Sequence, residues 1–154
     1  MNIILIFGDS IVVGRGIAKD KSWASRIAQH FDVKNKWNTI VYNLGIPGES
    51  TSELLKRFTL ECETRIQQHS LRDSVIIVIA EGINDSKGVG FPQSPKTSLK
   101  DSRQNTCKLI RSAKKYTERL IFVGLTPIDE NKTTTIDGNY FLNSSIKSYN
   151  LVTQ

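Results

Sequence analysis

Three short polar segments of this chain carry groups that suit acyl transfer, and each comes directly after a run of apolar residues. Ser10 follows the first run, Gly45 the second and Asn84 the third. A serine hydroxyl is a nucleophile, and backbone N–H groups together with a carboxamide stabilise the oxyanion that forms when it attacks a carbonyl. Each segment alone is typical of an ordinary turn, because Gly, Asp, Ser and Asn all favour turns. Their combination predicts a nucleophile beside an oxyanion hole.

Four apolar runs indicate the strands that position these groups, at residues 3–7, 39–42, 75–80 and 120–125. Each run is rich in Ile, Val, Leu or Phe, and none alternates cleanly with polar residues. Such runs are typical of strands buried on both faces of a parallel sheet. Ligands bind at the carboxyl ends of such strands, so the three polar segments are expected to share one edge of the sheet.

Helical patterns separate the apolar runs, which predicts an α/β fold. The expected caps are Ser22, a capping box from Ser50 to Glu53, and Ser98 with Asp101. The apolar stripes are expected at Trp23, Ile27 and Phe31, then at Leu55, Phe58, Cys62, Ile66 and His69, and then at Leu99, Thr106, Leu109, Ala113 and Tyr116. A last helical pattern carries Leu142, Ile146, Tyr149 and Val152 and reaches Gln154 without a stop signal. Residues 87–96 are expected to form an exposed, mobile loop.

The 154 residues are expected to form one domain, and the net charge of +6 contains no block of like charges. We therefore expect no nucleic-acid partner. The first apolar run is too short for a signal peptide or a membrane span, so a cytoplasmic protein without a membrane partner is expected. Cys62 and Cys107 lie in helical patterns and are expected to be reduced, half-buried thiols. The sequence leaves homo-oligomer formation open.

Other polar residues give weaker signals. Asp9 and Asp85 are expected to be structural, and the basic residues of the third helix to form its solvated side. The acidic residues after the fourth run are expected to be solvated, namely Asp129, Glu130 and Asp137. A Cys/His cluster that would indicate a metal is absent from the sequence, so no metal or other cofactor is expected.

The three polar segments resemble the blocks of the SGNH/GDSL hydrolase family. The first block is Gly8-Asp9-Ser10, the second is Asn43-Leu44-Gly45 with Gly48-Glu49-Ser50, and the third is Gly82-Ile83-Asn84-Asp85. The resemblance covers essentially the whole chain. It implies a flavodoxin-like three-layer α/β/α sandwich with strand order 2-1-3-4-5, and esterase, thioesterase, lysophospholipase or carbohydrate deacetylase activity on small acyl esters. It also implies Ser10 as the nucleophile, and the N–H groups of Ser10 and Gly45 with the Asn84 side chain as the oxyanion hole.

The family's last block, Asp-x-x-His, is missing from this sequence. The two histidines, His30 and His69, are expected near the ends of helices, partly buried or capping, at the end of the sheet opposite Ser10. A serine without a base is a weak nucleophile, so residues 1–154 alone are expected to be inactive or weak. We therefore expect a truncated hydrolase domain with strand order 2-1-3-4, whose fifth strand and Asp-x-x-His turn lie beyond Gln154.

In the hydrolase, apolar residues beside the nucleophile are expected to line an acyl pocket, namely Ile11, Val12, Val13, Ile46 and Pro47.

Two other functions stay open from the sequence. The alternative function is a catalytically inactive flavodoxin-like module that binds a small ligand or a protein partner. A phosphate or flavin binder ranks last, because the first loop lacks the Ser, Thr and Gly run that surrounds a phosphate.

Overall fold

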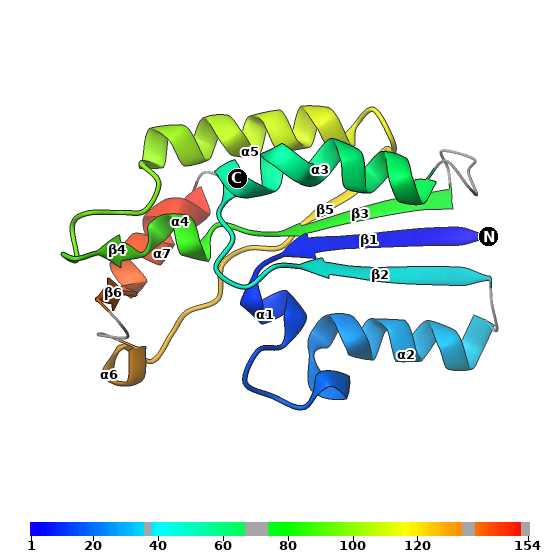
Figure 1. Cartoon of the computed structure of the whole chain (residues 1–154), viewed down its shortest axis with the longest axis horizontal. Helices are drawn as coiled ribbons and strands as arrows, with labels where there is room; N and C mark the ends of the chain where they lie inside the picture. Colours follow the sequence, from blue (N-terminus) through cyan, green and yellow to red (C-terminus); the bar gives the residue numbers. More distant parts are fainter. Residues whose placement is uncertain (36–37, 67–73, 134–137, 152–154) are drawn as a thin grey trace.

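The computed structural model describes residues 1–35, 38–66, 74–133 and 138–151 of the chain. Its centre is a parallel four-stranded sheet made of β1 (Asn2–Gly8), β2 (Thr39–Gly45), β3 (Val75–Ala80) and β5 (Arg119–Phe122). The strand order is β2-β1-β3-β5 (Figure 1), which confirms the predicted order of the four apolar runs. Apart from Asn2, β1 is buried along its whole length, which explains why its sequence does not alternate.

Helices cover both faces of the sheet, as the α/β pattern predicted (Figure 1). On one face α3 (Thr51–Ile66) and α5 (Leu99–Ala113) pack over a core built around Leu5, Phe7 and Phe58. On the other face α1 (Ser10–Val13) and α2 (Trp23–Asn35) pack over a smaller core. These helices occupy the two outer layers of the expected sandwich.

The helix caps agree with the sequence patterns, with one change in chemistry. The Ser22 hydroxyl accepts a hydrogen bond from the Ser25 N–H, and the Ser98 hydroxyl accepts one from the Asp101 N–H. At the start of α3 the Glu53 carboxylate accepts hydrogen bonds from both the N–H and the hydroxyl of Ser50. Half of the expected capping box therefore forms, because the Ser50 hydroxyl donates to Glu53 instead of accepting from its N–H.

The buried stripes of the helices differ from the predicted ones at their N-terminal ends. In α3 the apolar stripe begins with Leu54, which is fully buried, whereas Leu55, the residue predicted there, is half-buried. In α5 Ser102 is buried, whereas the predicted Leu99 is 43% exposed. Within α3 and α5 the rest of the predicted stripe is buried, so the same face of each helix meets the sheet.

Several short elements had no signal in the sequence analysis. A two-stranded antiparallel sheet joins β4 (Gly88–Val89) to β6 (Asn139–Tyr140), so the segment expected to be an exposed loop contains a strand. Three short helical turns connect the larger elements, namely η1 (Lys19–Lys21), α4 (Ile83–Ser86) and α6 (Glu130–Thr133). Elements of two to four residues are too short to show a periodic pattern.

The last described helix, α7 (Asn143–Asn150), holds the segment that follows β5. The Asn150 side chain accepts a hydrogen bond from the Leu125 N–H at 2.6 Å and donates one to the Leu125 carbonyl at 3.0 Å. Ile146 and Tyr149 are buried as predicted, and Val152 lies outside the described residues. This pairing fixes residues 123–126 beside the carboxyl end of β3.

Both cysteines are free thiols, as expected, but neither is half-buried: Cys62 is buried in the core and Cys107 is exposed on α5. Burial raises the pKa of the Cys62 thiol to about 12, so this side chain acts as a small apolar group. Within the described ranges no helix is long and apolar enough to cross a bilayer.

Candidate active site

The carboxyl ends of β2, β1 and β3 bring the predicted site residues to one edge of the sheet. Gly8, the last residue of β1, is in register with Gly45 on one side and with Ala80 on the other. A side chain at Gly8 would clash, because its Cβ would lie 2.3 Å from Val12 Cγ2 and 2.5 Å from the Ala80 carbonyl oxygen. The glycine therefore lets the chain turn tightly from β1 into the segment that contains Ser10.

Ser10 is the first residue of α1 and is half-buried. The Asp9 carboxylate caps this short helix by accepting the Ile11 N–H at 2.8 Å. The Ser10 hydroxyl forms no hydrogen bond within the described part of the chain. The Ser10 N–H, at the start of the helix, lacks an intrahelical acceptor. The turn thus presents an unpaired hydroxyl and an amide donor at the same position.

Asn84 lies in α4, directly after β3, and its side chain is turned toward the Ser10 turn. Its Nδ2 donates a hydrogen bond to Asp9 Oδ2 at 3.2 Å, and the residue is 5% exposed. The Asp9 carboxylate therefore holds both the Ser10 helix and the Asn84 carboxamide, one with each oxygen. These two hydrogen bonds are the structural role of Asp9, which the sequence analysis expected in general terms.

Gly45 packs against the backbone of the Ser10 turn. A Cβ at this position would lie 2.8 Å from the Asp9 carbonyl oxygen and 2.8 Å from Val13 Cγ2, so a larger residue could not approach so closely. The Gly45 N–H donates to Asn43 Oδ1 at 3.2 Å. This N–H would have to leave the Asn43 acceptor in order to bind an oxyanion.

Two further carboxylates, those of Asp85 and Glu49, hold the loop after β2 in place. Asp85 is fully buried and accepts hydrogen bonds from the Thr51 N–H at 2.9 Å and the Thr51 hydroxyl at 2.6 Å. The Glu49 carboxylate pairs with Arg57, which also donates to the Leu44 carbonyl at 2.6 Å. These bonds lock the loop after β2 to α3 and α4, and agree with the structural role expected for Asp85.

Glu81 is an unusual residue at this edge, and the sequence analysis missed it. It directly follows β3 and is 2% exposed, with Oε1 accepting the Gly82 N–H at 3.2 Å. Oε2 has no hydrogen-bond partner among the described residues. Burial, together with the nearby carboxyls of Asp9 and Asp85, raises the pKa of Glu81 to about 10. Glu81 is therefore a neutral acid near pH 7.

One of the two histidines and two of the three remaining acidic candidates lie among the described residues. His30 is exposed on α2, not partly buried as predicted, and its ring packs edge-on against Phe31. His30 comes two turns after Trp23, about 10 Å further along the helix. Asp129 is exposed, and Glu130 accepts the Asn143 N–H at the start of α7. His69 and Asp137 lie outside the described residues.

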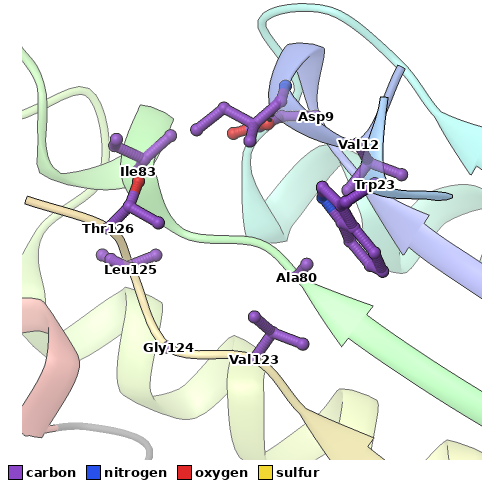
Figure 2. Close-up of a pocket in the computed structure, with 10 residues that line it drawn as sticks. Asp9, Val12, Trp23, Ala80, Ile83, Val123, Gly124, Leu125 and Thr126 are labelled. Atoms are coloured by element: carbon purple, nitrogen blue, oxygen red, sulfur yellow. Dashed lines mark hydrogen bonds between the residues drawn. The ribbon is translucent and has the colours of Figure 1, made fainter. Parts of the chain in front are cut away.

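An apolar pocket of about 220 Å³ opens beside Asp9, between the ends of β1 and β3 and the segment after β5. Figure 2 shows Trp23 and Val12 on one side of it, Ile83 and Leu125 on the other, and Ala80 between them. Ile11 and Val12 line the pocket as predicted, whereas the other three predicted residues do not, namely Val13, Ile46 and Pro47. Nothing in the sequence indicated that Trp23 lines this pocket, because the position of its side chain depends on how α2 packs against the sheet.

Comparisons with known proteins bear on the fold and on the family. A comparison with curated proteins finds no match. Among solved structures, the fold is similar to a lipase/acylhydrolase from Enterococcus faecalis, with a TM-score of 0.71 and 20% identity over 99% of this chain and 69% of that one. It is also similar to the psychrotrophic esterase EstA from Pseudoalteromonas sp., with a TM-score of 0.69 and 18% identity over 99% of this chain and 69% of that one. A third similar structure is TesA, with a TM-score of 0.69 and 17% identity over 98% of this chain and 70% of that one.

At these identities the solved structures show the shared fold, and this chain spans about 70% of their length. The family assignment comes from a sequence model, described as the GDSL-like lipase/acylhydrolase family, which matches residues 6–154. The matched region contains Ser10, Gly45 and Asn84 at the three strand ends described above. The chain belongs to the GDSL-like lipase/acylhydrolase family.

Proposed function

We propose that this chain carries the nucleophile and the oxyanion hole of a serine ester hydrolase that acts on small acyl esters or thioesters. The observation that carries the proposal is the hydrogen bond between Asn84 and Asp9, because it directs the carboxamide toward the residue next to Ser10. Gly45 packs against the same turn. Membership of an acylhydrolase family supports the reaction class.

The proposed reaction has two steps. The Ser10 hydroxyl oxygen attacks the carbonyl carbon of the ester, and its proton passes to a base and then to the departing alcohol or thiol. The oxyanion accepts hydrogen bonds from the N–H groups of Ser10 and Gly45 and from the Asn84 carboxamide. Water then attacks the acyl-serine, which releases the acid and restores the hydroxyl. We place the base, a histidine oriented by an aspartate, outside the 154 residues.

Replacing Ser10 by alanine in the complete gene product is expected to lower hydrolysis of p-nitrophenyl butyrate by at least about 1,000-fold, because no other group then forms the acyl intermediate. A fluorophosphonate probe is expected to label the parent protein and not the variant. The exposed Ser144 on α7 provides the control, because Ser144→Ala leaves the β1 turn unchanged. Retained hydrolysis in Ser10→Ala would remove Ser10 from its role, and an unlabelled parent would favour the inactive binding module.

The apolar pocket beside Asp9 is proposed to receive the acyl chain. Ala80→Leu would fill part of this pocket, so kcat/KM for p-nitrophenyl hexanoate is expected to fall about tenfold or more, while that for the acetate changes little. Ala18→Leu, at an exposed position before η1, adds the same side chain away from the pocket and should leave both values unchanged. Equal effects of Ala80→Leu on the two esters would place the acyl chain elsewhere.

A further inference from the structure

The net positive charge of this protein is concentrated in one segment, made of α5 and the two residues that follow it. The segment from the start of α5 to residue 115 contains six basic residues and one acidic residue, Asp101, which gives a net charge of +5. The whole chain carries +6, so the other 137 residues together contribute a net charge of +1. The basic excess therefore lies on α5 and the two lysines that follow it.

The basic side chains of α5 point away from the core. Ser102, Thr106, Leu109 and Ala113 are the buried residues of the helix. The opposite side carries four exposed basic residues, for which no ion pair forms within the described ranges, namely Lys100, Arg103, Lys108 and Arg111. We call these four residues the basic face of α5.

The neighbouring helix α3 is different. It carries three acidic and three basic residues, so its net charge is zero. Two of its basic residues, Arg57 and Arg65, form ion pairs with Glu61 on the same helix. The contrast shows that the basic face of α5 is not a general property of this layer of the molecule.

Exposed leucines lie at one end of the basic face. Leu99 is 43% exposed and Leu151 is 64% exposed, and both line a shallow hollow together with Lys100, Arg103 and Ser148. This end of α5 lies at the carboxyl edge of the sheet, on the side where α4 and α7 gather (Figure 1). Basic residues next to exposed leucines are the composition of surfaces that lie on an anionic bilayer.

We propose that the basic face of α5 binds peripherally to an anionic phospholipid surface, with Leu99 and Leu151 in contact with the interfacial region. The sequence analysis expected no membrane partner because no apolar run can span a bilayer, but peripheral binding needs no span. A nucleic acid is the less favoured polyanion, because none of the residues from Leu99 to Ala113 is aromatic and base stacking therefore has no platform here. The two leucines would also have no role against a phosphate backbone.

Vesicle sedimentation tests this proposal with the protein as it exists. At 50 mM NaCl the protein is expected to bind vesicles of phosphatidylcholine with 30% phosphatidylglycerol, and not vesicles of phosphatidylcholine alone. A variant with Lys100, Arg103, Lys108 and Arg111 all changed to Gln should bind at least tenfold more weakly. The same number of charges is removed in a control variant by changing Arg15, Lys19, Lys34 and Lys56, all exposed, to Gln. The control should bind within about twofold of the parent, and circular dichroism checks that both variants fold.

Three results would overturn the proposal. The first is equal binding of both lipid compositions, and the second is an α5 variant that binds as tightly as the control variant. The third is tighter binding to a 20-base-pair DNA duplex than to the anionic vesicles at the same salt concentration, which would identify a nucleic-acid surface instead. Hydrolysis of a soluble ester is a separate measurement, so failure here would leave the proposed catalytic function untouched.

Discussion

Replacement of Asp9 by asparagine is expected to lower kcat for p-nitrophenyl butyrate about 100-fold in the complete hydrolase, with little change in KM. Asp9 Oδ2 accepts the hydrogen bond that holds the Asn84 carboxamide. An asparagine would present an N–H₂ group there, so the Asn84 amide would have to rotate and withdraw its donor from the oxyanion. The loss of one such donor costs about 100- to 1,000-fold in kcat. Asp9 acts in this view as a positioning residue.

A reciprocal exchange separates this effect from a general loss of stability. In the double variant Asp9→Asn/Asn84→Asp, one carboxylate and one carboxamide face each other again, so most of the free energy of unfolding lost in Asp9→Asn, about 1–3 kcal/mol, is expected to return. Activity should not return, because a carboxylate at position 84 repels the oxyanion. Urea unfolding and steady-state kinetics measure the two quantities. Unchanged kcat in Asp9→Asn would refute the positioning role.

Glu81→Gln is expected to make the fold more stable at alkaline pH and to flatten the dependence of stability on pH. The pKa of Glu81 is raised from 4.5 to about 10 by burial and by its neighbouring carboxyls. Between these values the unfolded chain has lost a proton that the folded chain keeps, so the free energy of unfolding falls as pH rises. The contribution of Glu81 is therefore most favourable below pH 4.5 and declines until about pH 10. Glutamine keeps the acceptor for the Gly82 N–H and has no proton to lose.

The free energy of unfolding, measured in urea at pH 6.0 and pH 8.5, tests this prediction. The parent is expected to lose up to about 3 kcal/mol more than the variant between these two values, since each unit of pH corresponds to about 1.4 kcal/mol. Asp32→Asn, at an exposed position on α2, is the control and should retain the slope of the parent. An identical slope in Glu81→Gln would mean that Glu81 is already ionised in the folded protein.

The central sheet could be predicted from the sequence because its strands are apolar runs, and the two inner strands, β1 and β3, are largely buried. Four apolar runs each became a strand, and the two serine caps at positions 22 and 98 form as expected. The helix boundaries followed from the same local rules, since a cap involves residues within three positions of one another. The small sheet of β4 and β6 could not be predicted in this way, because it pairs residues that are about 50 positions apart.

Burial of polar groups was harder to predict than burial of apolar ones. Glu81 follows six apolar residues and has no local feature that marks it as a neutral acid, because its pKa is raised first by burial in the fold and then by the nearby carboxyls of Asp9 and Asp85. The half-formed capping box at Ser50 has a similar cause, since Lys96 from another loop also binds the Glu53 carboxylate and helps lower its pKa to about 2. In both cases residues that are distant in the sequence change an interaction that local residue spacing alone would predict.

The sequence by itself determined the turn that contains Ser10, the strands and the family, because each depends on residue types at short spacing. The tertiary structure decided which groups meet: the Asp9 carboxylate between α1 and Asn84, Trp23 in the apolar pocket, and the basic residues of α5 on one exposed face. The physical reason is that hydrogen bonds, pockets and surface charge depend on distances in space, and the parallel crossovers bring together residues that are tens of positions apart in the chain.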